Sequence, residues 1–158
     1  MKAISLMQPW AWMMTHGLPG IPMKDIENRK WQTSFRGTCL VHASKTFDKD
    51  GLEFIEDTLE DMGYDPELVL PQKYEMGGVV GIFTITDCVR HSKSPWFFGP
   101  YGFVVEKQYP LPFYPLRGQL NFFEVSQEIC NQIILDRSIS TSEYVPKGQL
   151  TMFGKGGW

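Results

Sequence analysis

The amino-acid sequence predicts one small α+β domain, in which five or six strands form a mixed or antiparallel barrel and two or three helices pack at its ends. The chain has 158 residues, a length that fits a single domain with a sizeable core. After the first helix-like segment, strand-like segments outnumber helical ones, and strands and helices do not alternate regularly. This order favours a barrel over a parallel sheet of repeated strand–helix–strand units.

The first part of the chain predicts a short strand followed by a short buried helix. Residues 2–7 alternate weakly between polar and apolar side chains, which is typical of a strand. Trp10, Met13 and Met14 then follow at helical spacing. We expect this stripe to belong to the core, with Trp10 or Trp12 also lining a cavity.

Charged and aromatic side chains concentrate in two strands that we expect near 25–31 and 37–43. Glu27, Arg29 and Trp31 occupy alternate positions, so they share one face of the first of these strands. Charged side chains such as these are rarely buried in a hydrophobic core. We expect this face to be either a solvated edge or the wall of a pocket.

An acidic helix is expected next. Asp48 is a suitable N-cap, and apolar residues then mark one face of a helix that ends at Gly63. A charge run on the other face would repel phosphate, so we expect this side of the molecule to stay away from nucleic acid. The acidic residues of that face are Glu53, Glu56, Asp57, Glu60 and Asp61.

Residues 79–89 carry the strongest strand signal, because valine, isoleucine and threonine dominate them. Gly81 inside this strand predicts a bulge or a close approach of another backbone. A further strand is expected at 103–106, whereas three prolines between 110 and 115 predict a stretch that is extended but unable to serve as a central strand. A last strand or turn is expected within 117–125.

The character of the chain changes at Ser126, where serine, threonine and glycine become frequent. We therefore divide the chain into a domain over residues 1–125 and a C-terminal extension over residues 126–158. The extension is expected to hold a short helix and to be partly peripheral or mobile towards its end.

Charge and cysteine content exclude several classes of protein. The net charge of -3 and pI near 5.6 lack the basic excess of proteins that wrap long duplex nucleic acid, so any such contact must be local. Three widely spaced cysteines predict free thiols in a reducing compartment, and we expect neither a metal nor a cofactor. No apolar run approaches the ~18 residues of a membrane span, so we expect a cytoplasmic protein without a membrane partner.

Several short motifs stand in a characteristic order. They are SLMQPWA at 5–11, KDIENRKW at 24–31, RG at 36–37 with VHASK at 41–45, and GVVG at 78–81 ahead of Thr84 and Asp87. SPW at 94–96, GP at 99–100 and RG at 117–118 follow. In this order and spacing the chain resembles the ASCH domains, relatives of the PUA-like β-barrels, over residues 1 to 125.

The resemblance implies a PUA-like open barrel with a cleft beside the first helix, and a role in recognising RNA or modified nucleobases. Some ASCH proteins are amidohydrolases that remove an acyl group from N4 of acylated cytidine, and at least one is ribonuclease-like. The amidohydrolases use a lysine, a threonine three residues later and a distant glutamate. Lys24 matches the lysine, but Glu27 stands in the threonine position, so the hydroxyl nucleophile is missing.

Lys24 and Glu27 are the central candidates for the expected cleft. Lysine can bind a phosphate or a carbonyl oxygen, and a carboxylate can accept from an amino group on a base edge, as with cytosine N4. In a hydrolase these two residues would be the catalytic pair, with Glu27 as a general base. The alternative is a surface ion pair, worth roughly 0–1 kcal/mol.

Further basic residues are candidates for phosphate contacts. Arg29 and Arg36 can each grip phosphate through two parallel hydrogen bonds or form salt bridges, and both interpretations stay open. Ser44 and Lys45 lie where their strand is expected to end, so they can face the cleft. His42, in the middle of that strand, is expected to be a hydrogen-bonded core residue.

Aromatic residues are candidates for stacking on a base, a contact worth roughly 1–3 kcal/mol per stacked base. Trp10, Trp31, Trp96 and Tyr101 have the required rings, although each alone is more often core. Gln8 and Trp10 are expected at the mouth of the cleft.

Three functions are compatible with these residues. The first is a binding module that recognises RNA, another single-stranded nucleic acid or a modified nucleotide. The second is a metal-independent hydrolase, amidohydrolase or ribonuclease-like, that acts on a modified nucleoside or RNA. The third is a protein-interaction domain that uses the aromatic loop around Trp96. Glu27 in the threonine position favours recognition over catalysis.

Overall fold

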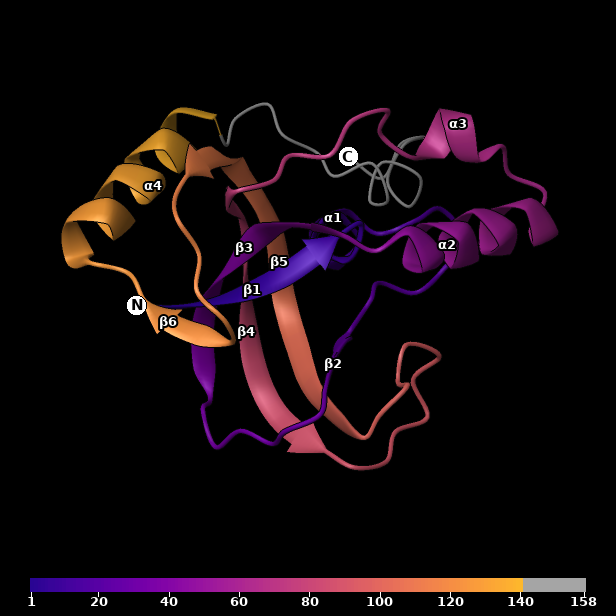
Figure 1. Ribbon diagram of the computed structural model, residues 1–158, viewed down its shortest axis with the longest axis horizontal. Coiled ribbons are helices and arrows are strands. Elements are labelled where there is room, and N and C mark those ends of the chain that lie inside the picture. The colour runs from indigo at the N-terminus through magenta and orange to yellow at the C-terminus, as the bar shows by residue number, and fades with distance from the viewer. Residues whose placement is uncertain (141–158) are drawn as a thin grey trace, which may run out of the picture.

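A computed structural model describes residues 1–140 of the chain (Figure 1). Within them, one mixed six-stranded sheet and four helices form an α+β architecture, which confirms the predicted class. The strands are β1 (Lys2–Gln8), β2 (Ile26–Arg29), β3 (Gly37–Phe47), β4 (Gly78–Val89), β5 (Tyr101–Pro115) and β6 (Phe122–Glu124). The helices are α1 (Trp10–His16), α2 (Lys49–Asp61), α3 (Pro66–Val69) and α4 (Gln127–Ser140).

The sheet is strongly curled but not closed into a barrel. Its order is β2-β5-β4-β3-β1-β6, so β2 and β6 are the two edges. β1 pairs with β3 in parallel, and all other neighbours are antiparallel. The curl brings β2 back towards β1, where the Arg29 guanidinium donates to the Ser5 carbonyl at 2.6 Å. An open seam bridged by a side chain therefore lies between these two strands.

β5 is longer than the strand expected at 103–106. It runs from Tyr101 to Pro115, and its proline-rich end is extended but does not lie between two strands, as expected. β2 pairs only with residues 101–104, whereas β4 pairs as far as Pro115. The proline-rich half thus has a ladder on one side only, and its free edge tolerates the missing N–H groups.

α1 packs against the sheet at Gly81 of β4. A Cβ built on Gly81 would lie 2.4 Å from Thr15 Cγ2 of α1 and 2.8 Å from the Tyr109 carbonyl oxygen of β5. The ladder between β4 and β5 also shifts register beside Gly81. The predicted bulge or close approach is confirmed, and it sets how closely α1 sits on the sheet.

Helices flank the sheet in the view of Figure 1, with α2 on the right and α4 on the left. α1 contributes Met14 to a core cluster that contains the fully buried Phe83 and Phe103. α4 buries Cys130 and Ile133 in a second cluster with residues of the sheet. The start of the predicted C-terminal extension is therefore a packed helix, while residues 141–158 lie outside the described residues.

α2 begins at the predicted cap and rests on α1. Asp48 Oδ1 accepts from the Gly51 backbone N–H at 2.9 Å, and Ile55 and Leu59 are buried on the apolar face. A Cβ on Gly51 would lie 2.7 Å from Trp10 Nε1, so the first turn touches the indole. Within residues 1–140, no helix is long and apolar enough to cross a membrane.

Candidate functional site

The seam between β1 and β2 opens into a cavity of about 370 Å³, which we call the seam cavity. It brings together the end of β1, the start of α1, the strand β2, the N-cap of α2 and the loop that precedes β5. Such a position, between elements far apart in the sequence, is typical of a ligand site. The lining residues are Ser5, Leu6, Met7, Trp10, Lys24, Glu27, Asn28, Arg29, Asp48 and Phe98.

Lys24 is the deepest charged residue of the seam cavity, with only 3% of its surface exposed. Its Nζ donates to the Ile26 carbonyl, lies 3.9 Å from Glu27 Oε2 and sits 5.6 Å from the centre of the Trp10 ring. Burial lowers the pKa of Lys24 from its ordinary value of 10.5, while the neighbouring Glu27 carboxylate opposes this shift. The charged form of Lys24 is thus only partly compensated by its surroundings.

The position of Lys24 is held by β5. Gln108, which is 8% exposed, donates from its amide nitrogen to the Lys24 carbonyl and, at 2.7 Å, to the Met14 carbonyl. One side chain of the sheet therefore ties the loop before β2 to the end of α1. This contact orients Lys24 into the cavity floor from an otherwise irregular segment.

Glu27 lies between the two cations of the seam cavity. Its Oε1 is 3.3 Å from Arg29 Nε, and its Oε2 faces Lys24. The shared strand face predicted for Glu27 and Arg29 is confirmed by this contact. The geometry between Arg29 Nε and Oε1 is poor for a hydrogen bond, so this buried N–H has no hydrogen-bond partner among the described residues.

Trp10 forms a wall of the seam cavity, as one of the two expected tryptophans. Its indole N–H donates to Asp48 Oδ2 at 2.8 Å, so the ring orientation is fixed by the cap of α2. Asp48 is thereby occupied on both oxygens, by Trp10 and by Gly51. This leaves Glu27 as the carboxylate of the cavity that is not committed to a cap.

Asn28 organises the aromatic loop beside the seam cavity. Its amide nitrogen donates to the Trp96 carbonyl at 2.9 Å, and its oxygen accepts from the N–H groups of Phe98 at 2.8 Å and Gly99 at 3.1 Å. Phe98 is consequently held at the rim with 58% of its surface exposed. Its ring stands perpendicular to that of Phe54 from α2, at 6.0 Å between centroids.

The sequence did not single out Asn28 or Phe98 as site residues. Both stand in or beside the motifs noted above, but their place depends on which ring of the 94–100 loop turns outward. Trp96, one of the four candidates for stacking, is 4% exposed, and its indole N–H donates to the Pro22 carbonyl at 2.9 Å. Trp96 therefore anchors the loop in the core, and Phe98 occupies the position expected for Trp96.

Gln8 does not lie at the mouth of the cleft, as had been expected. It is 2% exposed, its amide nitrogen donates to the Glu75 carbonyl at 2.8 Å, and its oxygen accepts from the Trp12 N–H at 2.9 Å. Both ends of the side chain are thus used to join α1 to the segment before β4. Its role in the structure is to connect elements.

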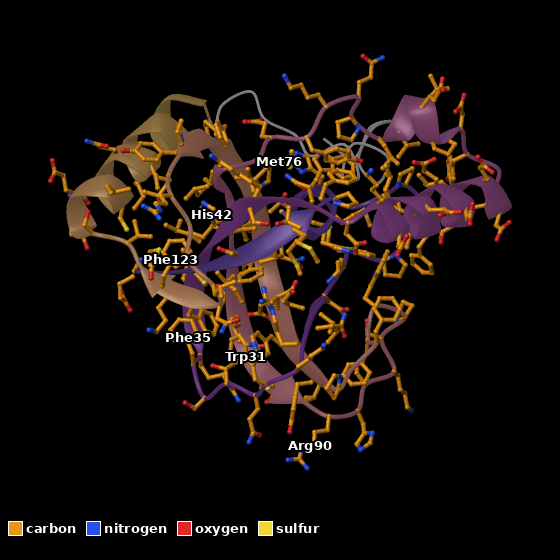
Figure 2. The ribbon with its side chains drawn as sticks, viewed as in Figure 1. Trp31, Phe35, His42, Met76, Arg90 and Phe123 are labelled. Carbon is orange, nitrogen blue, oxygen red and sulfur yellow. The ribbon has the colours of Figure 1, made fainter. Side chains whose placement is uncertain are left out.

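Trp31 and Arg36 also lie outside the seam cavity. Trp31 packs edge-on against Phe122 at 5.7 Å, and Figure 2 shows it near Phe35, which contacts the same ring. The guanidinium carbon of Arg29 lies 5.9 Å from the centre of the Trp31 ring, so Trp31 contacts the arginine from outside the seam cavity. Arg36 is exposed and pairs with Asp87 at 3.6 Å, which corresponds to the salt-bridge interpretation.

Ser44 and Lys45 line a separate cavity of about 860 Å³. They follow the buried part of β3 and share no cavity with Lys24. His42 lies beside them as a buried residue whose Nε2 is 2.7 Å from the Leu116 carbonyl oxygen, which confirms the expected hydrogen-bonded core histidine. The sequence predicts that Ser44 and Lys45 face the same cleft as Lys24. In the fold they line a different cavity.

Comparison of the chain with protein-family models and with curated proteins finds no match. The ASCH resemblance accordingly stays a prediction that rests on the motifs. Among the described residues, no cluster of three or more His, Cys, Asp and Glu side chains could hold a metal ion. The side chains of the seam cavity are the basis for a functional proposal.

Proposed function

We propose that this protein is an ASCH-like binding module of the PUA-like type, which recognises one base of a single-stranded RNA or of a modified nucleotide in the seam cavity. The observation that carries the proposal is the row Lys24–Glu27–Arg29 beside the Trp10 ring, in which Lys24 and Glu27 are buried and Arg29 is half-buried. It supplies donors and an acceptor next to an aromatic wall, in a site largely shielded from water. These are the groups that read the edge and the face of a base.

The chemistry of the row specifies the edge that would bind. The carboxylate of Glu27 accepts from an exocyclic amino group, and the ammonium of Lys24 donates to a neighbouring ring nitrogen or carbonyl oxygen. Cytosine and adenine both present an amino group beside an acceptor. We therefore expect amino-bearing bases to be preferred, with Arg29 and the Ser5 carbonyl that it contacts forming the far wall.

The test measures binding of cytidine and adenosine monophosphates and of short single-stranded RNA by calorimetry. Glu27→Gln removes the charged acceptor, so we expect it to cost about 1–3 kcal/mol of binding free energy. Since this substitution leaves two buried cations with less compensation, thermal unfolding must accompany the measurement.

A second variant keeps the test independent of folding. Met7 lines the cavity mouth and Met62 lies at the end of α2, and both are 43% exposed. Met7→Glu places a negative charge in the lining of the seam cavity, where it repels an anionic ligand, so binding should fall, whereas Met62→Glu, outside the cavity, should leave it unchanged. Equal affinities of these two variants, or no binding by the unmodified protein at low salt, would refute the proposal.

A metal-independent hydrolase is the second candidate, favoured by the lowered pKa of Lys24. A lysine with a depressed pKa beside a carboxylate is a recurrent feature of catalytic sites. The amidohydrolase hydroxyl has no counterpart among the described residues that line the seam cavity, because their one hydroxyl, Ser5 Oγ, donates to the Gln119 carbonyl at 2.7 Å. Turnover of N4-acetylcytidine or of RNA that disappears in Lys24→Met would favour this candidate over simple binding.

A further inference from the structure

The second cavity, on the other side of Ser5, differs from the seam cavity in charge. It is formed by the end of β3 with Ser44 and Lys45, by Gly77 and by the segment 115–120, and we call it the basic groove. Lys45 and Arg117 are its charged residues, and none of its described lining residues is Asp or Glu. Neither cation forms an ion pair with a described residue, so both are available to an anion.

The floor of the basic groove is rigid. The His42 ring lies under Gly118, where a Cβ would approach its Cε1 to 2.3 Å, and its Nε2 contacts the Leu116 carbonyl at 2.7 Å. The Leu116 N–H in turn donates to the Gly77 carbonyl at 3.2 Å. Arg117 thus lies between Leu116 and Gly118, which both contact buried neighbours. Figure 2 shows His42 in the packed interior near Phe123.

Lys45 is positioned by the opposite wall. A Cβ on Gly77 would come within 3.0 Å of Lys45 Cε, so the aliphatic stem lies along the glycine while the residue stays exposed. A lysine held in this way keeps its ammonium in water, where it can meet a phosphate at little desolvation cost. Two cations in one groove, with no carboxylate among its described lining residues, make a phosphate site more favourable than a scattered surface pair.

Ser5 connects the basic groove to the seam cavity, since it is the residue that lines both. Its carbonyl accepts from Arg29 on the seam side, and its hydroxyl donates to Gln119 on the groove side. Another large cavity differs in charge, because two carboxylates and one cation line it, those of Glu56, Glu67 and Lys73. A strand leaving the seam cavity therefore finds favourable charge on the side of the basic groove.

We propose that the basic groove binds the phosphate backbone next to the base held in the seam cavity, so that the ligand is a single-stranded oligonucleotide of at least two nucleotides. This inference rests on the proposed function and defines its substrate class. It excludes a free nucleoside as the best ligand. The acidic side of α2 directs the strand away from that helix and along Lys45 and Arg117.

The experiment compares the full chain with the double variant Lys45→Gln, Arg117→Gln, using the tetranucleotide ACAC of RNA and the nucleosides adenosine and cytidine as probes. Removing one phosphate-binding cation should make the dependence of log K on log salt shallower by about 0.7, so removing both should make it shallower by about 1.4. Affinity for the nucleosides should not change. Arg90→Gln, Lys93→Gln is the matched control, because both residues are exposed, neither lines the basic groove, and Figure 2 shows Arg90 at the bottom of the view, well below His42.

The outcomes separate this inference from the proposed function. Tetranucleotide binding with the same affinity and salt slope in the double variant would overturn the role of the groove and leave the seam cavity standing. Tetranucleotide binding that is sensitive to Lys45 and Arg117 but indifferent to Glu27→Gln would overturn the proposed base site and retain the groove. No binding of any probe by the unmodified protein would overturn both.

Discussion

Lys24 shows what it costs to bury the charged form of a single residue. Removing an ammonium from water is expensive, and only good pairing offsets the expense. Here the pairing is incomplete, because the nearest Glu27 oxygen lies 3.9 Å from Nζ and the same carboxylate also faces Arg29. A buried cation with spare donor capacity is typical of a site that completes its hydrogen bonds with a ligand.

The lowered pKa of Lys24 predicts how stability depends on pH. Because folding lowers this pKa from 10.5, the unfolded chain binds more protons than the folded protein between the lowered value and 10.5. The contribution of Lys24 to the free energy of unfolding is therefore unfavourable at neutral pH and is relieved as pH rises towards 10.5. Thermal unfolding of the protein and of Lys24→Met between pH 7 and 10 should show the protein gaining stability relative to the variant.

A parallel pH dependence of the two proteins would contradict this account. Lys30→Met provides the control, since Lys30 is an exposed lysine of the same motif. The difference in unfolding free energy between the protein and Lys30→Met should not change with pH.

Among the elements, the loop between β4 and β5 shows how one buried ring exposes another. Trp96 is anchored in the core through its indole, and Asn28 accepts from the N–H groups of Phe98 and Gly99. These hydrogen bonds to Asn28 fix the loop backbone so that the ring of Phe98 lies at the rim of the seam cavity. In this loop Trp96 is therefore structural, and Phe98 is exposed.

Alanine substitutions in this loop should separate the two roles. Phe98→Ala removes a 58% exposed ring, so the free energy of unfolding should change by less than about 0.5 kcal/mol. Affinity for single-stranded RNA should fall by about 1–3 kcal/mol if the ring stacks on a base. Trp96→Ala should instead destabilise the fold by about 3–5 kcal/mol. Denaturant unfolding and RNA titration of both variants measure the difference, and unaltered binding by Phe98→Ala would remove stacking from the site.

At the scale of the whole molecule, charge is distributed unevenly around one curled sheet. Glu56 of α2 and Glu67 of α3 line one cavity together with Lys73, and the two cations of the basic groove line another that has no carboxylate among its described lining residues. The overall net charge of -3 hides this separation. If the proposed function holds, this distribution favours contact with a short anionic strand at the basic groove over contact with a long polyanion.

The cysteines report on the integrity of the whole fold. Cys39 and Cys130 are buried in two different core clusters, whereas Cys88 is half-buried, and burial raises the pKa of Cys39 to about 12. Only a thiolate reacts readily, and a buried thiol is also shielded from reagents, so Cys39 and Cys130 should be modified only when the molecule unfolds. Labelling with a thiol reagent should therefore modify Cys88 in the native protein and all three thiols in denaturant. Native reaction at Cys39 would show that the sheet opens locally.

Local physical chemistry in the sequence was enough to place most elements. The first helix, the Asp48 cap, the strand beginning near Gly78 and the close approach at Gly81 follow from spacing and from residues with restricted backbone preferences. The length of β5 did not follow, because tolerance of proline depends on whether a neighbouring strand is present.

The sequence by itself determined that Glu27 and Arg29 would share one face, since they occupy alternate positions of a short strand, and that Lys24 would lie nearby. Only the tertiary structure decided what surrounds them. Gln8 and Trp96 turned inward and Phe98 outward because buried hydrogen bonds to distant partners select one rotation of each segment. Lys45 belongs to a second cavity because β1 lies between β3 and the seam, and strand order depends on long-range pairing that no local pattern encodes.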